Sequence, residues 1–183
     1  MEILERKHIA QGNKHIVLLG GMEMKQFWDK WKPYIFSVLI ALGIGGLSAL
    51  LSMNSMEAYN TTVTKPVLTP PGWVFSAVWT ILYVLMGISA ALVWMTKDSA
   101  ARSRGLNLYV TQLIVNFFWS LIFFNAQAFG FAAIWLLLLW VLVFLMIRQF
   151  YQVNKFAALL QIPYLIWLSF AVYLSISVWY LNM

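Results

Sequence analysis

The stretch "TKPVLTPPGWVFSAVW" (residues 64–79) places three prolines and a lysine directly before an apolar run that continues to Met95. Pro71 suits the first turn of a helix, where no backbone N–H is needed, and Pro70 holds Thr69 in an extended conformation. The stretch therefore predicts a stiff, polar connection that ends where a long apolar helix begins.

The whole chain is apolar: of its 183 residues, 62% are hydrophobic and 10% are charged. Soluble domains average about 45–50% apolar and about 25% charged residues. About 20 apolar residues cross a bilayer as a helix, and five segments reach that length: 34–53, 72–95, 106–124, 129–150 and 156–181. The period-two alternation of a membrane barrel is absent. We predict an all-α integral membrane protein in which residues 25–183 form a five-transmembrane-helix bundle.

Basic residues are distributed unevenly around these segments. With the amino terminus inside, 11 of the 12 Lys and Arg residues fall on the inner side and only Lys65 on the outer side. Because cytoplasmic loops are enriched in Lys and Arg, we expect a bacterial cytoplasmic membrane protein with its amino terminus inside, its carboxyl terminus outside and connection 54–71 outside. Residues 1–24 are mixed and polar, so we expect a tail of which residues 1–22 are dispensable, or a later start at Met22 or Met24.

The side chains available for chemistry are few. The chain has no cysteine, and its histidines, His8 and His15, both lie in the tail, so we expect no metal site in the bundle. Apart from Arg148 near the end of its segment, the predicted spans contain no charged residue. Proton pumps and ion-coupled transporters usually place charges there, and hydrolases need a nucleophile with a base or paired carboxylates. The sequence argues against these classes.

Aromatic side chains are abundant instead, with 10 Trp, 13 Phe and 8 Tyr. Tryptophans at span ends suit an interfacial belt, whereas Trp79, Trp119 and Trp167 lie inside their spans. A buried indole requires a partner for its N–H. These three residues are therefore either packed core or the wall of a ligand pocket.

The third predicted span carries a polar and aromatic stripe: Gln112, Asn116, Trp119, Ser120 and Phe123. Spacings of three and four place these residues on one helical face. Because unpaired amides are costly in lipid, this face should point inward. Asn116 could serve helix–helix contact alone, but an indole and an amide on one stripe favour a cavity.

Two further patterns concern packing. Ser37, Ala41, Gly45 and Ala49 recur at every fourth position of the first span, which is typical of close helix contact. Pro163 removes one backbone donor from the last span and predicts a kink there.

Three segments together resemble a known family: "KPVLTPPGWVFSAVW" (65–79), "QLIVNFFWSLIFF" (112–124) and "PYLIWLSFAVYLS" (163–175). From about Pro33 to the end, the chain is similar to the TspO/MBR family, the tryptophan-rich sensory proteins related to the mitochondrial translocator protein (peripheral benzodiazepine receptor). The resemblance implies a five-helix bundle, often dimeric, with a pocket on the side of the first loop. Members of that family bind porphyrins such as protoporphyrin IX and haem, and also sterols.

The resemblance also implies site residues. Trp79 and Trp167 match the family's pocket tryptophans, and the full ligand-binding set that we expect is Trp79, Tyr83, Asn116, Trp119, Ser120, Phe123, Trp167 and Ala171. The expected lid and helix entry consist of Tyr59, Asn60, Lys65, Pro66, Pro70 and Pro71. Tyr59 and Asn60 stand where many members have Trp-Tyr, and Ser175 stands where many have Asn. The sterol-associated pattern lacks its basic residue after Tyr180.

We therefore expect a membrane receptor that binds porphyrins for sensing, sequestration or transport, with Lys65 attracting propionates. It should require no cofactor; its partners should be the tetrapyrrole, the bilayer and a second copy in a homodimer, without nucleic acid. One alternative is a light- and oxygen-dependent porphyrin-degrading enzyme that uses Trp79 and Trp167. Another is a sterol, lipid or small-molecule transporter, which five spans without an evident internal repeat disfavour.

Overall fold

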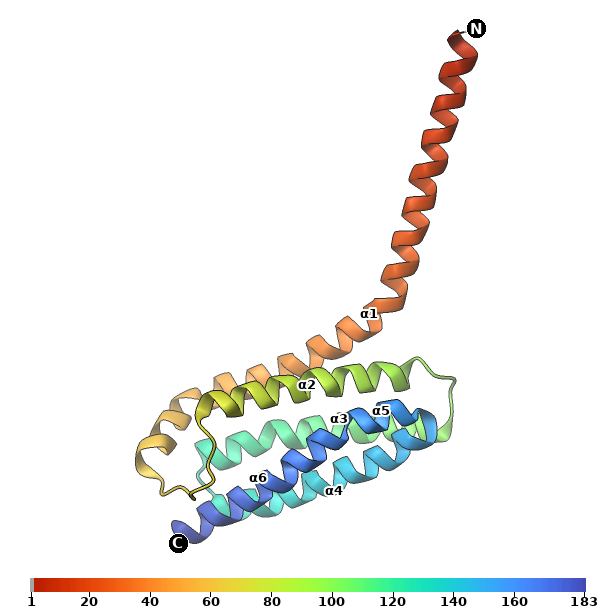
Figure 1. Ribbon diagram of the computed structural model, residues 1–183. Coiled ribbons are helices and arrows are strands. Elements are labelled where there is room, and N and C mark those ends of the chain that lie inside the picture. Colours follow the sequence, from red (N-terminus) through yellow and green to blue (C-terminus); the bar gives the residue numbers. More distant parts are fainter. Residues whose placement is uncertain (1) are drawn as a thin grey trace.

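The structure is a helical bundle in which the second part of α1 and the other helices run along a common long axis, while the first part of α1 projects away from it (Figure 1). The computed structural model describes the backbone of residues 2–183 and the side chains of residues 24–183. In chain order the elements are α1 (Glu2–Thr62), α2 (Gly72–Trp94), α3 (Ala100–Ser120), the π-helical turn η1 (Leu121–Asn125), α4 (Phe129–Val153), α5 (Lys155–Leu160) and α6 (Ile162–Leu181). The predictions made for residues 1–23 lie outside the described side chains.

Five stretches of the described chain are long and apolar enough to cross a membrane: Met24–Thr62, Gly72–Trp94, Ala100–Asn125, Phe129–Val153 and Lys155–Leu181. They correspond one by one to the five predicted spans, and residues 2–183 contain no strand. The all-α, five-span fold is therefore confirmed.

The first helix is longer than its predicted span. We predicted that the span ends at Met53 and that a connection covers residues 54–71, but α1 continues to Thr62. Residues 54–62 contain no proline or glycine, and the hydroxyls of Thr61 and Thr62 donate to the Ala58 carbonyl over 3.0 and 2.8 Å. Hydropathy marks only the part of a helix that is apolar, so it ended the span too early.

The third span is also longer, because a cap rather than hydropathy sets its start. The Ser99 hydroxyl accepts a hydrogen bond from the Arg102 backbone N–H over 3.2 Å, and α3 begins at Ala100 instead of Leu106. The Arg102 guanidinium pairs with Asp98 and donates to the Trp94 carbonyl over 2.7 Å. These bonds fasten the short connection between α2 and α3.

The last span is interrupted close to the predicted kink. α5 ends at Leu160 and α6 begins at Ile162, so Pro163 occupies the first turn of α6. A proline in that position removes no hydrogen bond that the new helix needs. The interruption occurs beside Pro163, as its missing donor predicted.

Small residues allow α1 and α2 to approach closely. A Cβ added at Gly87 would lie 2.5 Å from the Cα of Val38, and one added at Gly45 would lie 2.1 Å from the Tyr83 ring. Ala41 and Gly45 are buried as the predicted stripe requires, but Ala49 is exposed. The buried face of α1 continues through Ser48 and Ser52 instead.

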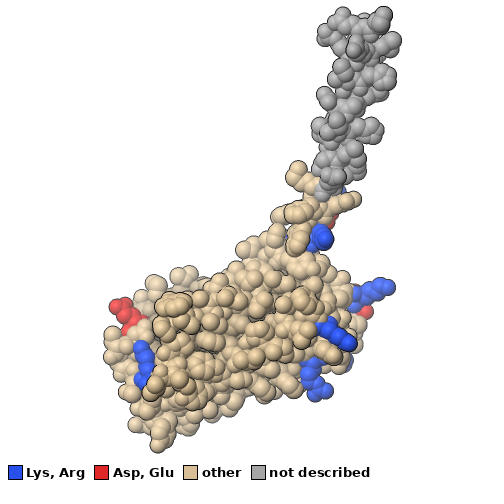
Figure 2. Space-filling model, viewed as in Figure 1, with Lys and Arg blue, Asp and Glu red and all other residues tan. Residues whose placement is uncertain are grey.

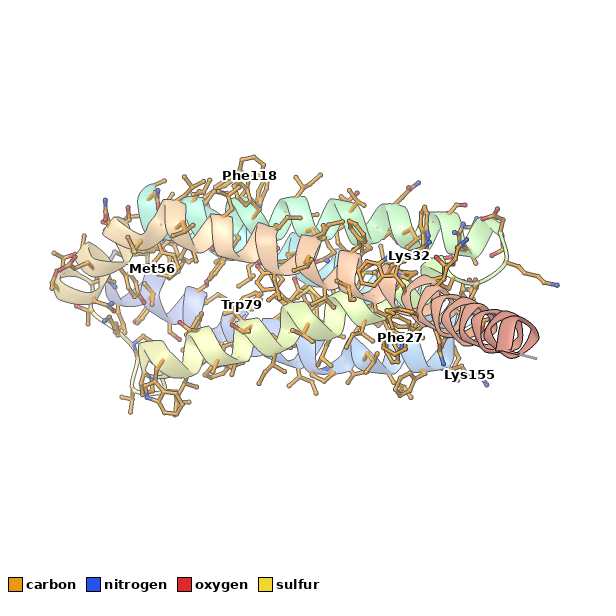
Figure 3. All side chains as sticks on the ribbon, turned by 90° about the horizontal axis from the view of Figure 1, so that it is seen from above. Phe27, Lys32, Met56, Trp79, Phe118 and Lys155 are labelled. Atoms are coloured by element: carbon orange, nitrogen blue, oxygen red, sulfur yellow. The ribbon has the colours of Figure 1, made fainter. Side chains whose placement is uncertain are left out.

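The two ends of the bundle differ in charge. On the face drawn in Figure 2, Lys and Arg side chains gather at one end of the bundle and are sparser at the other. In Figure 3, Lys32 and Lys155 lie at the first end and Met56 at the opposite one. We call these the basic end and the Lys65 end, because Lys65 follows Met56 in the connection from α1 to α2.

Candidate functional site

A cavity of about 360 Å³ lies at the Lys65 end, within the range of about 300–1,000 Å³ that is usual for ligand pockets. We call it the chamber. It is formed by the end of α1, the connection 63–71, the start of α2, α3 with η1, and α6. Its lining residues are Met56, Tyr59, Asn60, Lys65, Thr69, Pro70, Pro71, Gly72, Phe75, Ser76, Trp119, Phe123, Phe124, Ala171, Leu174, Ser175 and Val178.

One wall of the chamber is a cluster of aromatic rings. The rings of Trp119 and Phe123 are stacked with centroids 5.2 Å apart, and Tyr59 lies 5.4 Å from Phe123 and 5.3 Å from Phe124. Phe123 and Phe124 are neighbours in sequence, yet both line the chamber. They lie in η1, and such π-helical turns are frequent at functional sites.

Two buried polar atoms in the lining have no partner. Trp119 is 4% exposed and Ser175 is 1% exposed, and neither the Trp119 Nε1 nor the Ser175 Oγ makes a hydrogen bond in the described structure. A buried polar group without a partner costs about 1–3 kcal/mol. The chamber thus contains two groups, on α3 and α6, that a ligand oxygen could satisfy.

The mouth of the chamber carries a single lysine. The Lys65 Nζ donates to the Asn60 Oδ1 over 2.7 Å and to the Asn60 carbonyl over 3.2 Å. It also lies 5.2 Å from the centroid of the Tyr59 ring. No described carboxylate forms an ion pair with Lys65, so its charge remains available to an anionic group.

The connection above the chamber is fastened at several points. Pro66 accepts from the Thr69 hydroxyl over 2.7 Å and from the Thr69 backbone N–H over 3.0 Å. Pro70 and Pro71 line the chamber directly. This connection is therefore a short, stiff cover rather than a long loop.

The polar stripe of α3 points inward, as predicted. Gln112, Asn116, Trp119 and Phe123 are all buried, and Ser120 is half-buried. Of these five residues, only the aromatic pair lines the chamber.

The amides of this stripe are satisfied by tyrosines. The Asn116 Nδ2 donates to the Tyr83 hydroxyl over 3.2 Å, and the Tyr164 hydroxyl donates to the Gln112 Oε1 over 3.0 Å. Trp79 contacts both tyrosines, with ring centroids 5.6 Å from Tyr83 and 6.1 Å from Tyr164. These five residues form a polar layer that is separate from the lining of the chamber.

The predicted site residues thus fall into two groups. The structure brings eight of them together in the chamber: Tyr59, Asn60, Lys65, Pro70, Pro71, Trp119, Phe123 and Ala171. Six do not line it: Trp79, Tyr83, Asn116, Ser120, Trp167 and Pro66. Trp167 lies one ring behind the lining, 5.3 Å from Phe75, and borders a groove between α2 and α6.

The sequence interpretation missed the α6 wall except for Ala171. Leu174, Ser175 and Val178 also line the chamber. They follow Ala171 at intervals of three, four and seven residues, which places all four on one helical face. That spacing would have found them once Ala171 was assigned to the pocket.

The comparisons with known proteins agree with the resemblance seen in the three motifs. A sequence model of the TspO/MBR family matches residues 36–181. The tryptophan-rich protein TspO of Archaeoglobus fulgidus is 35% identical over 51% of this chain and 60% of its own length, so the match spans less than two thirds of that protein. The protein CrtK of Rhodobacter capsulatus is 36% identical over 70% of this chain and 81% of its own length.

The similarity extends to animals. The translocator protein of Homo sapiens is 39% identical over 70% of this chain and 77% of its own length. The family match covers the first apolar helix from residue 36 on, the other four apolar helices, and every residue that lines the chamber. This chain therefore belongs to the TspO/MBR family of integral membrane proteins.

Proposed function

We propose that the chamber binds a planar, hydrophobic tetrapyrrole that carries carboxylates, such as protoporphyrin IX, and that the protein serves sensing, sequestration or transport of that ligand. The observation that carries the proposal is the chemical combination in one cavity. Stacked aromatic rings, two buried groups without partners and one free cation meet there. Such a cavity selects ligands that are largely apolar and carry a few polar groups.

The aromatic wall suits the face or edge of a macrocycle. Offset stacking and edge contacts between rings contribute about 0.5–1.5 kcal/mol beyond the burial of area. Trp119 and Phe123 already adopt such a stacked arrangement. Lys65 at the mouth would meet propionates, since a half-buried lysine attracts carboxylates.

A metal-free porphyrin suits the bundle better than tightly ligated haem. The usual axial ligands of haem iron are histidine, cysteine, methionine and tyrosine. The chain has no cysteine, and both histidines precede residue 24. Within the chamber lining, only Met56 and Tyr59 belong to those residue types, so neither a histidine nor a cysteine of the lining could hold haem iron.

The membrane orientation that we propose follows from the two ends of the bundle. Positive residues are retained on the cytoplasmic side, and the basic end would therefore face the cytoplasm. The chamber then opens outward. Relatives named "Tryptophan-rich sensory protein" (Cereibacter sphaeroides) and "Translocator protein" support a sensor or transporter type of role.

The test is a titration of the purified full chain with protoporphyrin IX in darkness, followed by tryptophan quenching and by porphyrin absorbance. Trp119→Ala and Phe123→Ala should each weaken binding by roughly threefold to tenfold. Phe118→Ala is the matched control, because Phe118 is on α3, is 45% exposed and points away from the bundle (Figure 3).

Equal affinities for the wild type and all three variants, each with an unchanged melting temperature, would refute the proposal. Repeating the titration in light and oxygen addresses the enzymatic alternative. A new absorbing product that depends on the protein would favour porphyrin degradation over binding alone.

A further inference from the structure

A further hollow lies on the membrane-facing surface, towards the basic end and away from the chamber. It is a groove of about 500 Å³ between α1, α2 and α5. Its walls are almost entirely apolar: Trp31, Tyr34, Ile35, Val38, Leu39, Ile88, Leu92 and Phe156. We call it the α1–α2 groove.

The groove begins where α1 and α2 touch. The backbone of Val38 lies against Gly87, so the two helices are in close contact at that level. Ile88 and Leu92 follow Gly87 towards the basic end, and Tyr34 and Trp31 precede Val38 in the same direction. The groove therefore runs from the contact between α1 and α2 to the basic end of the bundle.

Positive charge borders the end of the groove. The Lys30 Nζ lies 5.8 Å from the ring centroid of Trp31, which lines the groove. Lys155 directly precedes the lining residue Phe156 at the start of α5, and its Nζ lies 5.5 Å from the centroid of the nearby Tyr151 ring. Figure 3 places Lys155 and Lys32 at the same end of the bundle.

The only described carboxylate in this part of α1 is already engaged. Asp29 forms an ion pair with Lys32 over 2.6 Å. Among residues 24–183, neither Lys30 nor Lys155 forms an ion pair with a carboxylate. Within residues 24–183, the end of the groove therefore presents two lysines without a paired carboxylate beside an apolar channel.

We propose that the α1–α2 groove is a binding site for one anionic phospholipid. An acyl chain would occupy the apolar channel, and the phosphate and anionic headgroup would lie between Lys30 and Lys155. Trp31 and Tyr34 would lie at the level of the headgroup, where amphipathic rings are favoured. Basic pockets between membrane helices bind such headgroups because their charge is complementary.

The charge argument separates this ligand from other membrane lipids. A zwitterionic headgroup brings its own cation, which offsets the attraction of the two lysines. A sterol has no anionic group for them. The proposal concerns a surface remote from the chamber and does not depend on the proposed function.

The experiment uses the full chain, purified in detergent and mixed with equal amounts of dioleoyl phosphatidylglycerol and dioleoyl phosphatidylcholine. Native mass spectrometry then measures which lipid is retained. We expect preferential retention of one phosphatidylglycerol, and Lys30→Gln with Lys155→Gln should reduce that retention by roughly tenfold or more. The matched control, Lys97→Gln with Arg148→Gln, removes the same charge from the basic end without touching the groove.

Two results would overturn the proposal. Equal losses in the two double variants would indicate a diffuse attraction to the basic end and no defined site. Equal retention of dihexanoyl and dioleoyl phosphatidylglycerol would exclude a role for the apolar channel. Circular dichroism melting of each variant confirms that the bundle remains folded.

Discussion

The side chain of Asn182 pairs with both backbone groups of Thr64. Its Oδ1 accepts from the Thr64 N–H over 3.0 Å, and its Nδ2 donates to the Thr64 carbonyl over 2.9 Å. The same Nδ2 donates to the Val178 carbonyl over 2.8 Å. Residues 118 positions apart in the chain thereby join the end of α6 to the cover of the chamber.

Replacement of Asn182 by alanine should loosen that cover. A hydrogen bond contributes about 0.5–1.5 kcal/mol, so we expect protoporphyrin IX to dissociate roughly threefold to tenfold faster from Asn182→Ala. Stopped-flow fluorescence measures this rate. Leu181→Ala, an exposed neighbour, is the control. An unaltered rate in Asn182→Ala would show that the hydrogen bonds between Asn182 and Thr64 do not retain the ligand.

Replacement of Ser175 should separate stability from affinity. The Ser175 hydroxyl is buried without a partner, so Ser175→Ala should leave the melting temperature unchanged or raise it. If a ligand oxygen satisfies that hydroxyl, porphyrin affinity should nevertheless fall by roughly twofold to tenfold. Ser177→Ala is the control, because Ser177 lies on a less buried side of α6. An equal loss of affinity in Ser177→Ala would contradict the assignment of Ser175 to the ligand site.

The charge of Lys65 should matter only for ligands with free carboxylates. Lys65→Gln retains a donor for Asn60 but removes the charge, so affinity for protoporphyrin IX should fall about twofold to fivefold. Affinity for its dimethyl ester should not change. Added salt should weaken binding of the free acid by the wild type more than by the variant; equal effects on acid and ester would argue against a carboxylate at Lys65.

Gly87 should be intolerant of a side chain because α1 lies against it. A Cβ there would meet the Val38 Cα at 2.5 Å and its N at 2.6 Å, and backbone cannot rotate away. Overpacking of this kind typically costs about 1–3 kcal/mol, so Gly87→Ala should lower the melting temperature in detergent. A Cβ added at Gly43 has no atom within 4 Å, so Gly43→Ala should not lower the melting temperature. Similar melting temperatures of the two variants would show that α1 does not pack against α2 at Gly87.

Several features could be predicted from the sequence because each depends on one segment at a time. A run of about 20 apolar residues is sufficient to define a span, so the five helices were predicted correctly. Helical periodicity together with the cost of unpaired amides oriented Gln112 and Asn116 inward. The prolines of the connection 63–71 and Pro163 predicted interruptions of the helices, and the structure contains both interruptions.

Helix ends were predicted less well, because a helix ends at a cap or a breaker and not where hydropathy falls. α1 continues past Met53 to Thr62, where the hydroxyls of Thr61 and Thr62 donate to the Ala58 carbonyl, and the Ser99 cap starts α3 early. The first of these differences matters for the chamber, since the added turns carry Tyr59 into its wall.

The composition of the chamber was decided by tertiary structure alone. Periodicity shows which residues face inward, but all inward residues of one helix look alike until the neighbouring helices are placed. Asn116 meets the hydroxyl of Tyr83, so that level is filled and the amide is satisfied. Trp119 meets an opening that the short side chains of Ala171 and Ser175 leave on α6. The volumes of side chains on different helices, summed at one depth, determine whether an inward residue becomes packed core or the wall of a cavity.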